Sequence, residues 1–241
     1  MANSCSAMTA SADPGGFMIN EIYKLDIFGG VYITTTHISL LLVSILLIGF
    51  AVVVNRKLAK AKPEDTPGGL QNVAELIVEM LSNMVKGIMG ENGKKFVNYI
   101  MLVFIFILCS NISGLLGLRP PTADYGVTLP LGIITFFLIH VNGIKKHKIG
   151  HFRGWLDPIP LFLPINIISD VAVPISLSLR LFGNVLSGTV LMGLIYGMAP
   201  VFIRFGIPSV LHVYFDLFAG AIQTYVFSML TMVYVSSAIS D

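Results

Sequence analysis

The sequence predicts an all-α membrane protein, and three observations carry this prediction. Hydrophobic residues make up 55% of the 241-residue chain, charged residues make up 12%, and the mean hydropathy is +0.82. Several apolar stretches of at least ~17 residues follow one another, each long enough to cross a hydrocarbon core of about 30 Å. These stretches are continuous and rich in Leu, Ile and Phe, without the alternating polar residues of a transmembrane β-barrel.

The predicted elements form a single polytopic membrane domain over residues 1–241. Residues 1–30 are rich in Ser, Ala and Gly and lack helical periodicity until Ile22, which predicts a loose tail with room for a short surface helix. About five membrane-embedded helices are expected after the tail, at 36–54, 96–118, 127–144, 161–199 and 207–239.

One further helix, over residues 70–89, is predicted to be amphipathic. Glu75, Glu79, Ser82 and Lys86 form a polar stripe opposite the apolar positions, as on a helix that lies at an interface or against other helices.

Basic residues set the expected orientation. Arg56 and Lys57 directly follow the first span, and a denser basic cluster over residues 145–153 follows the third. Because Lys and Arg accumulate in cytoplasmic loops, the N-terminal tail is expected outside and the C-terminus in the cytoplasm.

The last two apolar stretches are longer than a membrane crossing requires. As straight helices, residues 161–199 and 207–239 would measure about 58 Å and 50 Å at ~1.5 Å per residue. They must therefore be steeply tilted, bent or partly outside the core. Pro164 and Pro174 offer places to bend the first of them.

Arg180 is the most informative residue of the chain, because it sits near the middle of the apolar stretch 161–199. A guanidinium stays charged throughout the protein pH range, and placing one at bilayer depth costs about 2.5–3.5 kcal/mol on insertion scales. Such a residue is expected to face a partner, a water-filled cavity or an ion path.

Polar residues follow one side of each long helix. At ~100° per residue, the 161–199 helix gathers Asn166, Ser169, Ser176, Arg180, Gly183, Asn184 and Ser187 on one side, with Asp170 at its edge. The 207–239 helix gathers His212, Asp216, Gly220, Gln223, Thr231 and Tyr234. Interhelical hydrogen bonds of ~0.6 kcal/mol each explain most of the hydroxyls, whereas both a packing role and a functional role stay open for Asn184 and Gln223.

Several classes of protein fit poorly. The net charge of +2 gives no broad basic face, so no nucleic-acid partner is expected. Metal-binding and nucleotide-binding motifs are absent from the sequence, so neither a cofactor nor ATP chemistry within this chain is expected. A secondary transporter and a membrane enzyme remain the alternatives, although the two halves show no repeated pair of Gly/Pro-broken segments and no catalytic set stands out.

Three motifs of the sequence belong together. The first is Leu-Arg-Leu-Phe-Gly-Asn over residues 179–184, preceded by Pro174 and followed by Gly188. The second is the segment 221–231 around Gln223, and the third is the loop 121–124. Together they resemble the subunit a family of bacterial F-type rotary ATP synthases. The resemblance covers nearly the whole chain, and the combination of the arginine motif with the downstream glutamine is highly specific.

The resemblance implies a non-catalytic stator subunit of the membrane Fo sector in a bacterial plasma membrane, carrying H⁺ or Na⁺ for ATP synthesis. The implied partners are the c-subunit ring, the b subunits of the peripheral stalk, the F1 sector indirectly, and the lipid bilayer. The two long helices would form a hairpin against the ring, with Arg180 facing the ring carboxylates.

The resemblance also implies two half-channels for the ion. Asp216, Gln223 and His212 would line one of them, while Asn166, Asp170 and Asn184 would lie nearer the other or at the ring face. His140, beside the basic loop, is interpreted as structural.

The chain departs from the family pattern at three positions. Thr189 stands where many relatives place a carboxylate, Asp216 stands where others carry His or Glu, and Val173 replaces a common Lys. The first two departures indicate that the acidic group of the access path has moved to the neighbouring helix.

Overall fold

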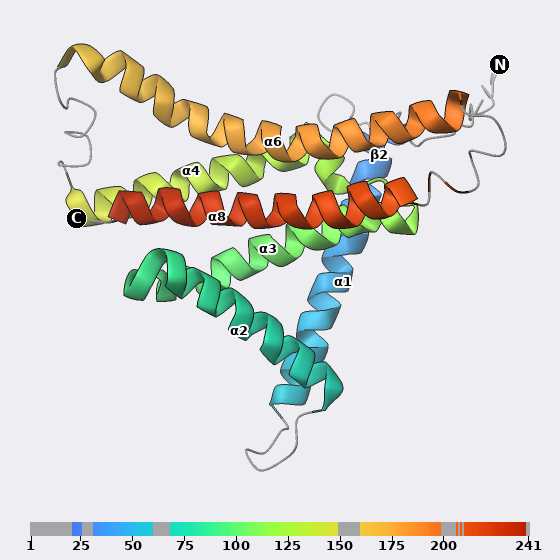
Figure 1. The fold of residues 1–241 in the computed structure, drawn as a ribbon, viewed down its shortest axis with the longest axis horizontal. Coiled ribbons are helices and arrows are strands. Elements are labelled where there is room, and N and C mark those ends of the chain that lie inside the picture. The colour runs from blue at the N-terminus through green and yellow to red at the C-terminus, as the bar shows by residue number, and fades with distance from the viewer. Residues whose placement is uncertain are drawn as a thin grey trace.

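The computed structural model describes residues 21–25, 31–59, 68–148, 160–198, 206, 208 and 210–239, and this part of the chain is almost entirely helical (Figure 1). The main helices are α1 (Thr35–Leu58), α2 (Gly69–Met89), α3 (Val97–Ile112), α4 (Tyr125–His147), α6 (Leu163–Met198) and α8 (Gly220–Ile239). Within these residues, five helices are long and apolar enough to cross a membrane. The prediction of an all-α membrane protein is confirmed.

A short hairpin precedes α1. Strand β1 (Glu21–Leu25) pairs antiparallel with β2 (Val31–Thr34). The expectation of a loose tail with a short surface helix is therefore wrong for this segment, because Val, Tyr, Ile and Thr in succession favour a strand. Residues 1–20, the rest of the expected tail, lie outside the described residues.

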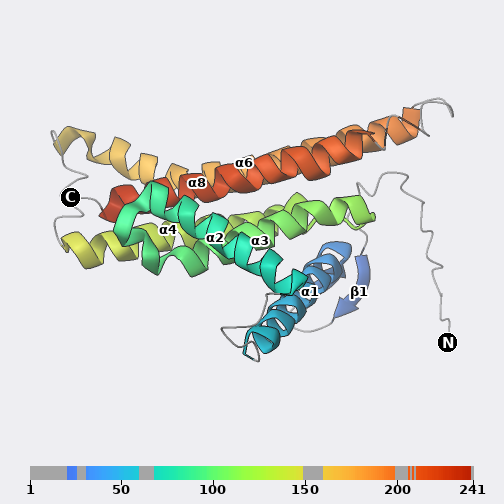
Figure 2. The ribbon, with the colours of Figure 1, turned by 60° about the horizontal axis from the view of Figure 1, so that its bottom comes forward.

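The two longest helices lie side by side and run in opposite directions (Figures 1 and 2). Helix α6 has 36 residues, and the continuous helical stretch that ends with α8 runs over Val210–Ile239. Helix α4 packs against both, α3 packs mainly against α8, and α1 stands apart from this layer (Figure 2). The excess length that the sequence indicated is thus present in both helices.

Apolar side chains from distant parts of the chain hold the layer together. One cluster joins Val103 and Ile107 of α3 to Leu177 and Leu181 of α6 and to Phe227 of α8. Because lipid tails are as apolar as these side chains, close packing provides the stabilisation between membrane helices.

Helices α4 and α6 approach each other closely at Gly132. A methyl group on Gly132 would lie 2.5 Å from the carbonyl oxygen of Pro174, so only glycine fits there. Pro174 lies inside α6 and removes the backbone N–H that would bond the carbonyl of Asp170, four residues earlier. These two residues therefore define the geometry of the α4–α6 contact.

Helix α2 is amphipathic, as predicted. It buries Leu81, Val85 and Met89, while Glu75 and Glu79 are exposed. A 3-10 turn (Gly90–Lys95) connects it to α3, and there Lys94 hydrogen-bonds Glu91 and lowers the pKa of this exposed carboxyl.

Candidate functional site

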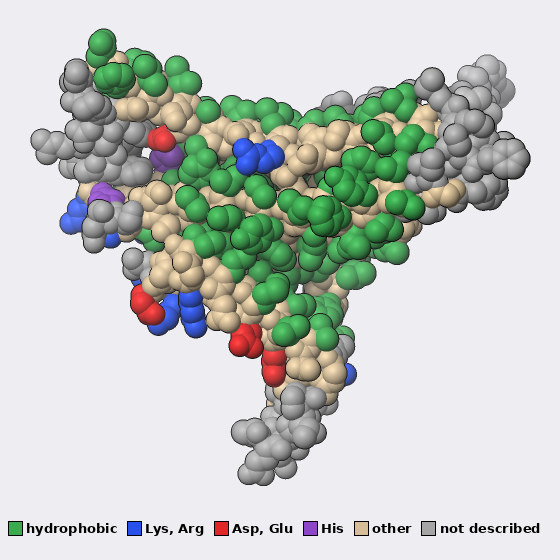
Figure 3. Space-filling model, in the orientation of Figure 1, with side chains coloured by type: hydrophobic (Ala, Val, Ile, Leu, Met, Phe, Trp, Pro, Cys, Tyr) green, Lys and Arg blue, Asp and Glu red, His purple; other side chains and the backbone are tan. Residues whose placement is uncertain are grey.

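Arg180 lies on the exposed side of α6. The neighbouring polar positions Gly183, Asn184 and Ser187 are exposed as well, and Leu179 beside it is 48% exposed. In Figure 3, hydrophobic side chains cover much of α8 and the outer edge of α6, while a band of other side chains and backbone runs along α6. Within the described ranges, the Arg180 side chain makes neither an ion pair nor a hydrogen bond. The guanidinium of Arg180 is thus exposed on a stripe of small and polar residues along a helix that is otherwise apolar.

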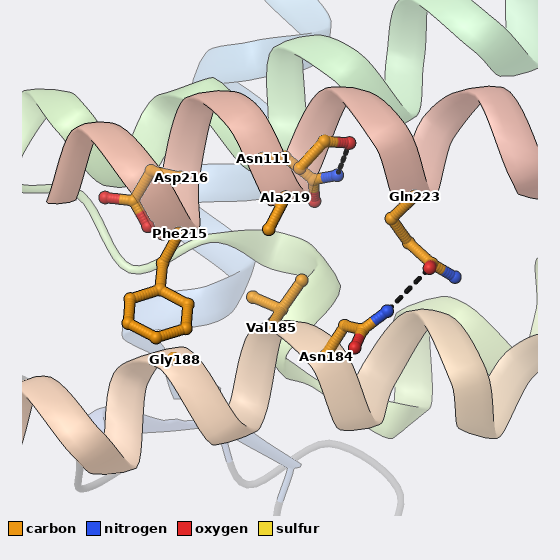
Figure 4. Close-up of a pocket in the computed structure, with 9 residues that line it drawn as sticks. Asn111, Asn184, Val185, Gly188, Phe215, Asp216, Ala219 and Gln223 are labelled. Carbon is orange, nitrogen blue, oxygen red and sulfur yellow. Dashed lines mark hydrogen bonds between the residues drawn. The ribbon is translucent and has the colours of Figure 1, made fainter. Parts of the chain in front are cut away.

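An amide pair joins α6 to α8 one helical turn after Arg180. Nδ2 of Asn184 donates a 2.6 Å hydrogen bond to Oε1 of Gln223 (Figure 4). Gln223 is only 4% exposed, and its buried Nε2 has no hydrogen-bond partner in the part of the chain that the structure describes. The Asn184–Gln223 pair therefore leaves one buried amide donor of Gln223 unused within the described residues.

A small cavity with both polar and apolar lining residues extends from this amide pair between α3, α6 and the helical stretch that ends with α8 (Figure 4). Its volume of about 10 Å³ matches a single water molecule. The lining residues are Asn111, Asn184, Val185, Gly188, Phe215, Asp216, Ala219, Gly220 and Gln223.

Asn111 is the fully buried hub on the α3 side of this cavity. Its Nδ2 donates to the carbonyl oxygen of Gly220 at 3.0 Å, and its Oδ1 accepts from the Thr122 hydroxyl at 2.7 Å. A methyl group on Gly220 would lie 2.9 Å from Asn111 Cβ, so the glycine permits this contact.

Asp216 lies in a π-helical segment (Val213–Ala219) that leads into α8. Such segments occur inside α-helices and are frequent at functional sites. Oδ2 of Asp216 lies 2.8 Å from Nδ1 of His212, and the Asp216 side chain is 15% exposed. A methyl group on Gly114 would lie 2.8 Å from Asp216 Cγ, so the loop after α3 presses directly against this carboxylate.

A second, larger cavity of about 300 Å³ opens on the other side of Asp216. Its polar lining residues are Arg119, Thr189, Tyr196, His212 and Asp216. Asp216 thus lines both cavities, and Thr189 lines the same wide cavity from α6. Asp216, in the segment before α8, therefore lines the same cavity as position 189 on α6.

Asp170 and Asn166 lie elsewhere, in the first turns of α6. Asp170 Oδ2 is 3.6 Å from Nε2 of His140 on α4, and Asn166 lies one turn earlier and is half-buried. The predicted site residues therefore separate into two groups. His212, Asp216, Gln223 and Asn184 come together, Asn166 and Asp170 form the other group, and Arg180 lies on α6 between them.

Sequence reasoning missed Asn111, Thr122 and Gly114. Asn111 was the detectable one, since an amide inside the apolar stretch 96–118 needs a partner at membrane depth. Nothing local in the sequence marks Gly114 as the residue that contacts a carboxylate about 100 positions later.

The fold and the site define a polytopic helical membrane protein with ionisable groups gathered between its two longest helices. Residues 37–236 match the family described as ATP synthase A chain, and the chain belongs to this family. The resemblance in the sequence motifs is confirmed, and the family associates the chain with ATP synthesis and ion transport.

Relatives extend over most of the chain. It is 36% identical to the ATP synthase subunit a, sodium ion specific, of Propionigenium modestum, with 91% of this chain and 80% of that protein aligned. It is 31% identical to the ATP synthase subunit a of Moorella thermoacetica, over 90% of this chain and 94% of the relative. It is 38% identical to an ATP synthase subunit a of Pelobacter propionicus, over 76% and 80%.

Proposed function

We propose that this chain is the non-catalytic, ion-translocating stator subunit of the Fo sector of a rotary ATP synthase in a bacterial plasma membrane. The observation that carries the proposal is Arg180, which is exposed in the middle of a helix long and apolar enough to cross a membrane and has no acidic partner within the described residues. An arginine in this setting needs a partner from outside the chain, and family membership suggests the carboxylates of a c-subunit ring.

The chemistry follows from the fixed charge of Arg180. A positive charge within a few ångströms lowers the pKa of a carboxylate, so a ring carboxylate that passes the guanidinium releases its ion. Arginine suits this role because it does not give up its own proton. The same charge repels free cations and so blocks a direct leak past the arginine.

Two aqueous paths reach the arginine in this proposal. The first passes the wide cavity and Asp216 and continues along Gln223 and Asn184 towards the ring face. The second leads past Asp170 and Asn166 at the start of α6. Since α4 ends in Lys145, Lys146 and His147, this second path opens to the cytoplasm, with the N-terminus outside and the C-terminus in the cytoplasm.

The partners follow from the surfaces. The apolar outer face of α6 and α8 suits the c-ring, while the remaining exposed apolar surface, including α1, suits lipid and the b subunits of the peripheral stalk. The F1 sector is contacted indirectly. The proposal contains no nucleic-acid partner.

The test is Arg180→Ala in the purified complex, reconstituted into lipid vesicles. ATP synthesis driven by an imposed ion gradient is expected to vanish, while the complex still assembles and hydrolyses ATP. Ser187→Ala is the matched control, because this hydroxyl is exposed on the same helix and bonds only the carbonyl of Asn184 among the described residues. Gradient-driven synthesis that persists in Arg180→Ala would refute the proposed function.

A further inference from the structure

His140, which the sequence analysis interpreted as structural, lies close to Asp170 at the start of α6. His140 Nε2 is 3.6 Å from Asp170 Oδ2, across the contact between α4 and α6. The histidine side chain is 16% exposed and that of the aspartate 38%, so the pair lies at the border between the packed layer and its surface. Figure 3 shows charged and histidine side chains gathered towards the end of the molecule where α6 begins.

The second ring nitrogen fixes which atom faces the carboxylate. Nδ1 of His140 lies 3.0 Å from the carbonyl oxygen of Phe136. A carbonyl oxygen only accepts hydrogen bonds, so Nδ1 carries a hydrogen in this geometry and Nε2 is the nitrogen that gains or loses a proton. The Phe136 ring, with its centroid 4.1 Å from the imidazole centroid, holds the ring in this orientation.

The backbone around the pair is closely packed. One turn after Asp170, Pro174 presents its carbonyl oxygen to Gly132, two turns before His140. Because this approach leaves no room for a side chain on α4, it sets the spacing of the helices that carry the two groups. The distance between His140 and Asp170 is therefore fixed by the packing of α4 against α6, since each helix carries one of the two residues.

We propose that His140 is an ion-pair partner of Asp170 on the second ion path. This inference rests on the proposed function. When a proton on this path binds Nε2, the imidazole becomes an imidazolium that lies 3.6 Å from the Asp170 carboxylate, within ion-pair distance but beyond that of a direct hydrogen bond. Release of the same proton from Nε2 restores the neutral imidazole, so charge and protons balance and the carried ion at this point is a proton.

The experiment measures ATP synthesis by the complete complex in vesicles under an imposed proton gradient. His140→Gln keeps a polar side chain of similar reach and removes the titrating nitrogen. It is expected to slow synthesis about tenfold, the scale on which partners that orient a functional group act. His147→Gln at the end of α4 is the matched control and is expected to keep the full rate.

Two further variants separate a proton-holding role from a packing role. His140→Ala is expected to regain synthesis when imidazole is added to the vesicles, but not in an Asp170→Asn background. Since the two residues act as a unit, the double variant His140→Gln with Asp170→Asn is expected to be no slower than Asp170→Asn alone. Full activity of His140→Gln, additive losses, or a loss that imidazole does not restore would each overturn the inference.

Arg180→Ala in the same assay separates this inference from the function on which it rests. If Arg180→Ala is inactive while His140→Gln synthesises ATP at the full rate, only the inference on His140 fails. If Arg180→Ala still synthesises ATP, the proposed function itself fails.

Discussion

The amide of Asn184 donates a hydrogen bond to Gln223 that bridges α6 and α8 one turn from Arg180. This contact fixes how the two longest helices are turned relative to each other at the position of the arginine. It also connects the exposed face of α6 to the small cavity of about 10 Å³, because both amides line that cavity.

Asn184→Ala is expected to destabilise the complex by about 1 kcal/mol, because the nearly buried Gln223 loses its donor. Thermal unfolding of the purified complex measures this loss. Ser187→Ala, one turn further on the same face, is the control and is expected to change the unfolding temperature little. Equal shifts in the two variants would show that the amide contact contributes nothing specific.

Asp216→Asn is expected to slow gradient-driven ATP synthesis without abolishing it, since the shape of the site is kept while its negative charge is lost. Thr189→Glu introduced into Asp216→Asn is expected to restore part of the rate, because positions 189 and 216 line the same cavity of about 300 Å³.

Thr189→Glu alone is the control for this pair. Two carboxylates facing one cavity repel each other, so the single variant is expected to be slower than the protein with Thr189. Failure of the double variant to exceed Asp216→Asn would contradict the interpretation that the acid has moved between helices.

Gly132→Ala is expected to destabilise the protein by about 1–3 kcal/mol, the range for forcing an extra methyl group into a packed contact. The new methyl would meet the Pro174 carbonyl oxygen at 2.5 Å. Thermal unfolding again measures the effect. Gly87→Ala in α2 has open space around the added methyl and serves as the control, so similar losses in both variants would speak against the close approach of α4 and α6.

Arg180→Lys is expected to lower ATP synthesis about tenfold or more, although the charge at neutral pH is nominally the same. A lysine ammonium in apolar surroundings can lose its proton, whereas the guanidinium does not, so the defect is expected to widen as the pH rises. Synthesis rates at several pH values measure this. A rate that equals that of Arg180 throughout would show that any positive charge suffices.

Several features of the fold were predictable from local sequence. Continuous apolar stretches gave the membrane class, and the spacing of Glu75, Glu79 and Lys86 gave the amphipathic face of α2. The excess length of the last two helices was also predictable, because it depends only on the number of apolar residues against the membrane thickness. The hairpin before α1 was missed, since short strands depend on pairing between segments.

Arg180, Asp216 and Gln223 were identifiable by residue type alone, because a charge or an amide at membrane depth is costly unless it has a partner or a function. Which of these side chains lie together could not be predicted. The π-helical segment Val213–Ala219 changes the angular register before α8, so a regular helical projection does not describe how Asp216 is turned relative to Gln223.

The sequence by itself determined that this is a helical membrane protein of the ATP synthase subunit a family, with the charged residue Arg180 near the middle of its longest helix. The tertiary structure alone decided that Asn111, Gly114 and Thr122 close the site from a distant segment, and that His140 lies against Asp170. The physical reason is that the free-energy cost of burying a side chain depends on the type of that residue, so it can be read from the sequence. Contacts between helices depend instead on how closely their backbones approach. Glycines at 114, 132 and 220 permit the close approaches in this protein.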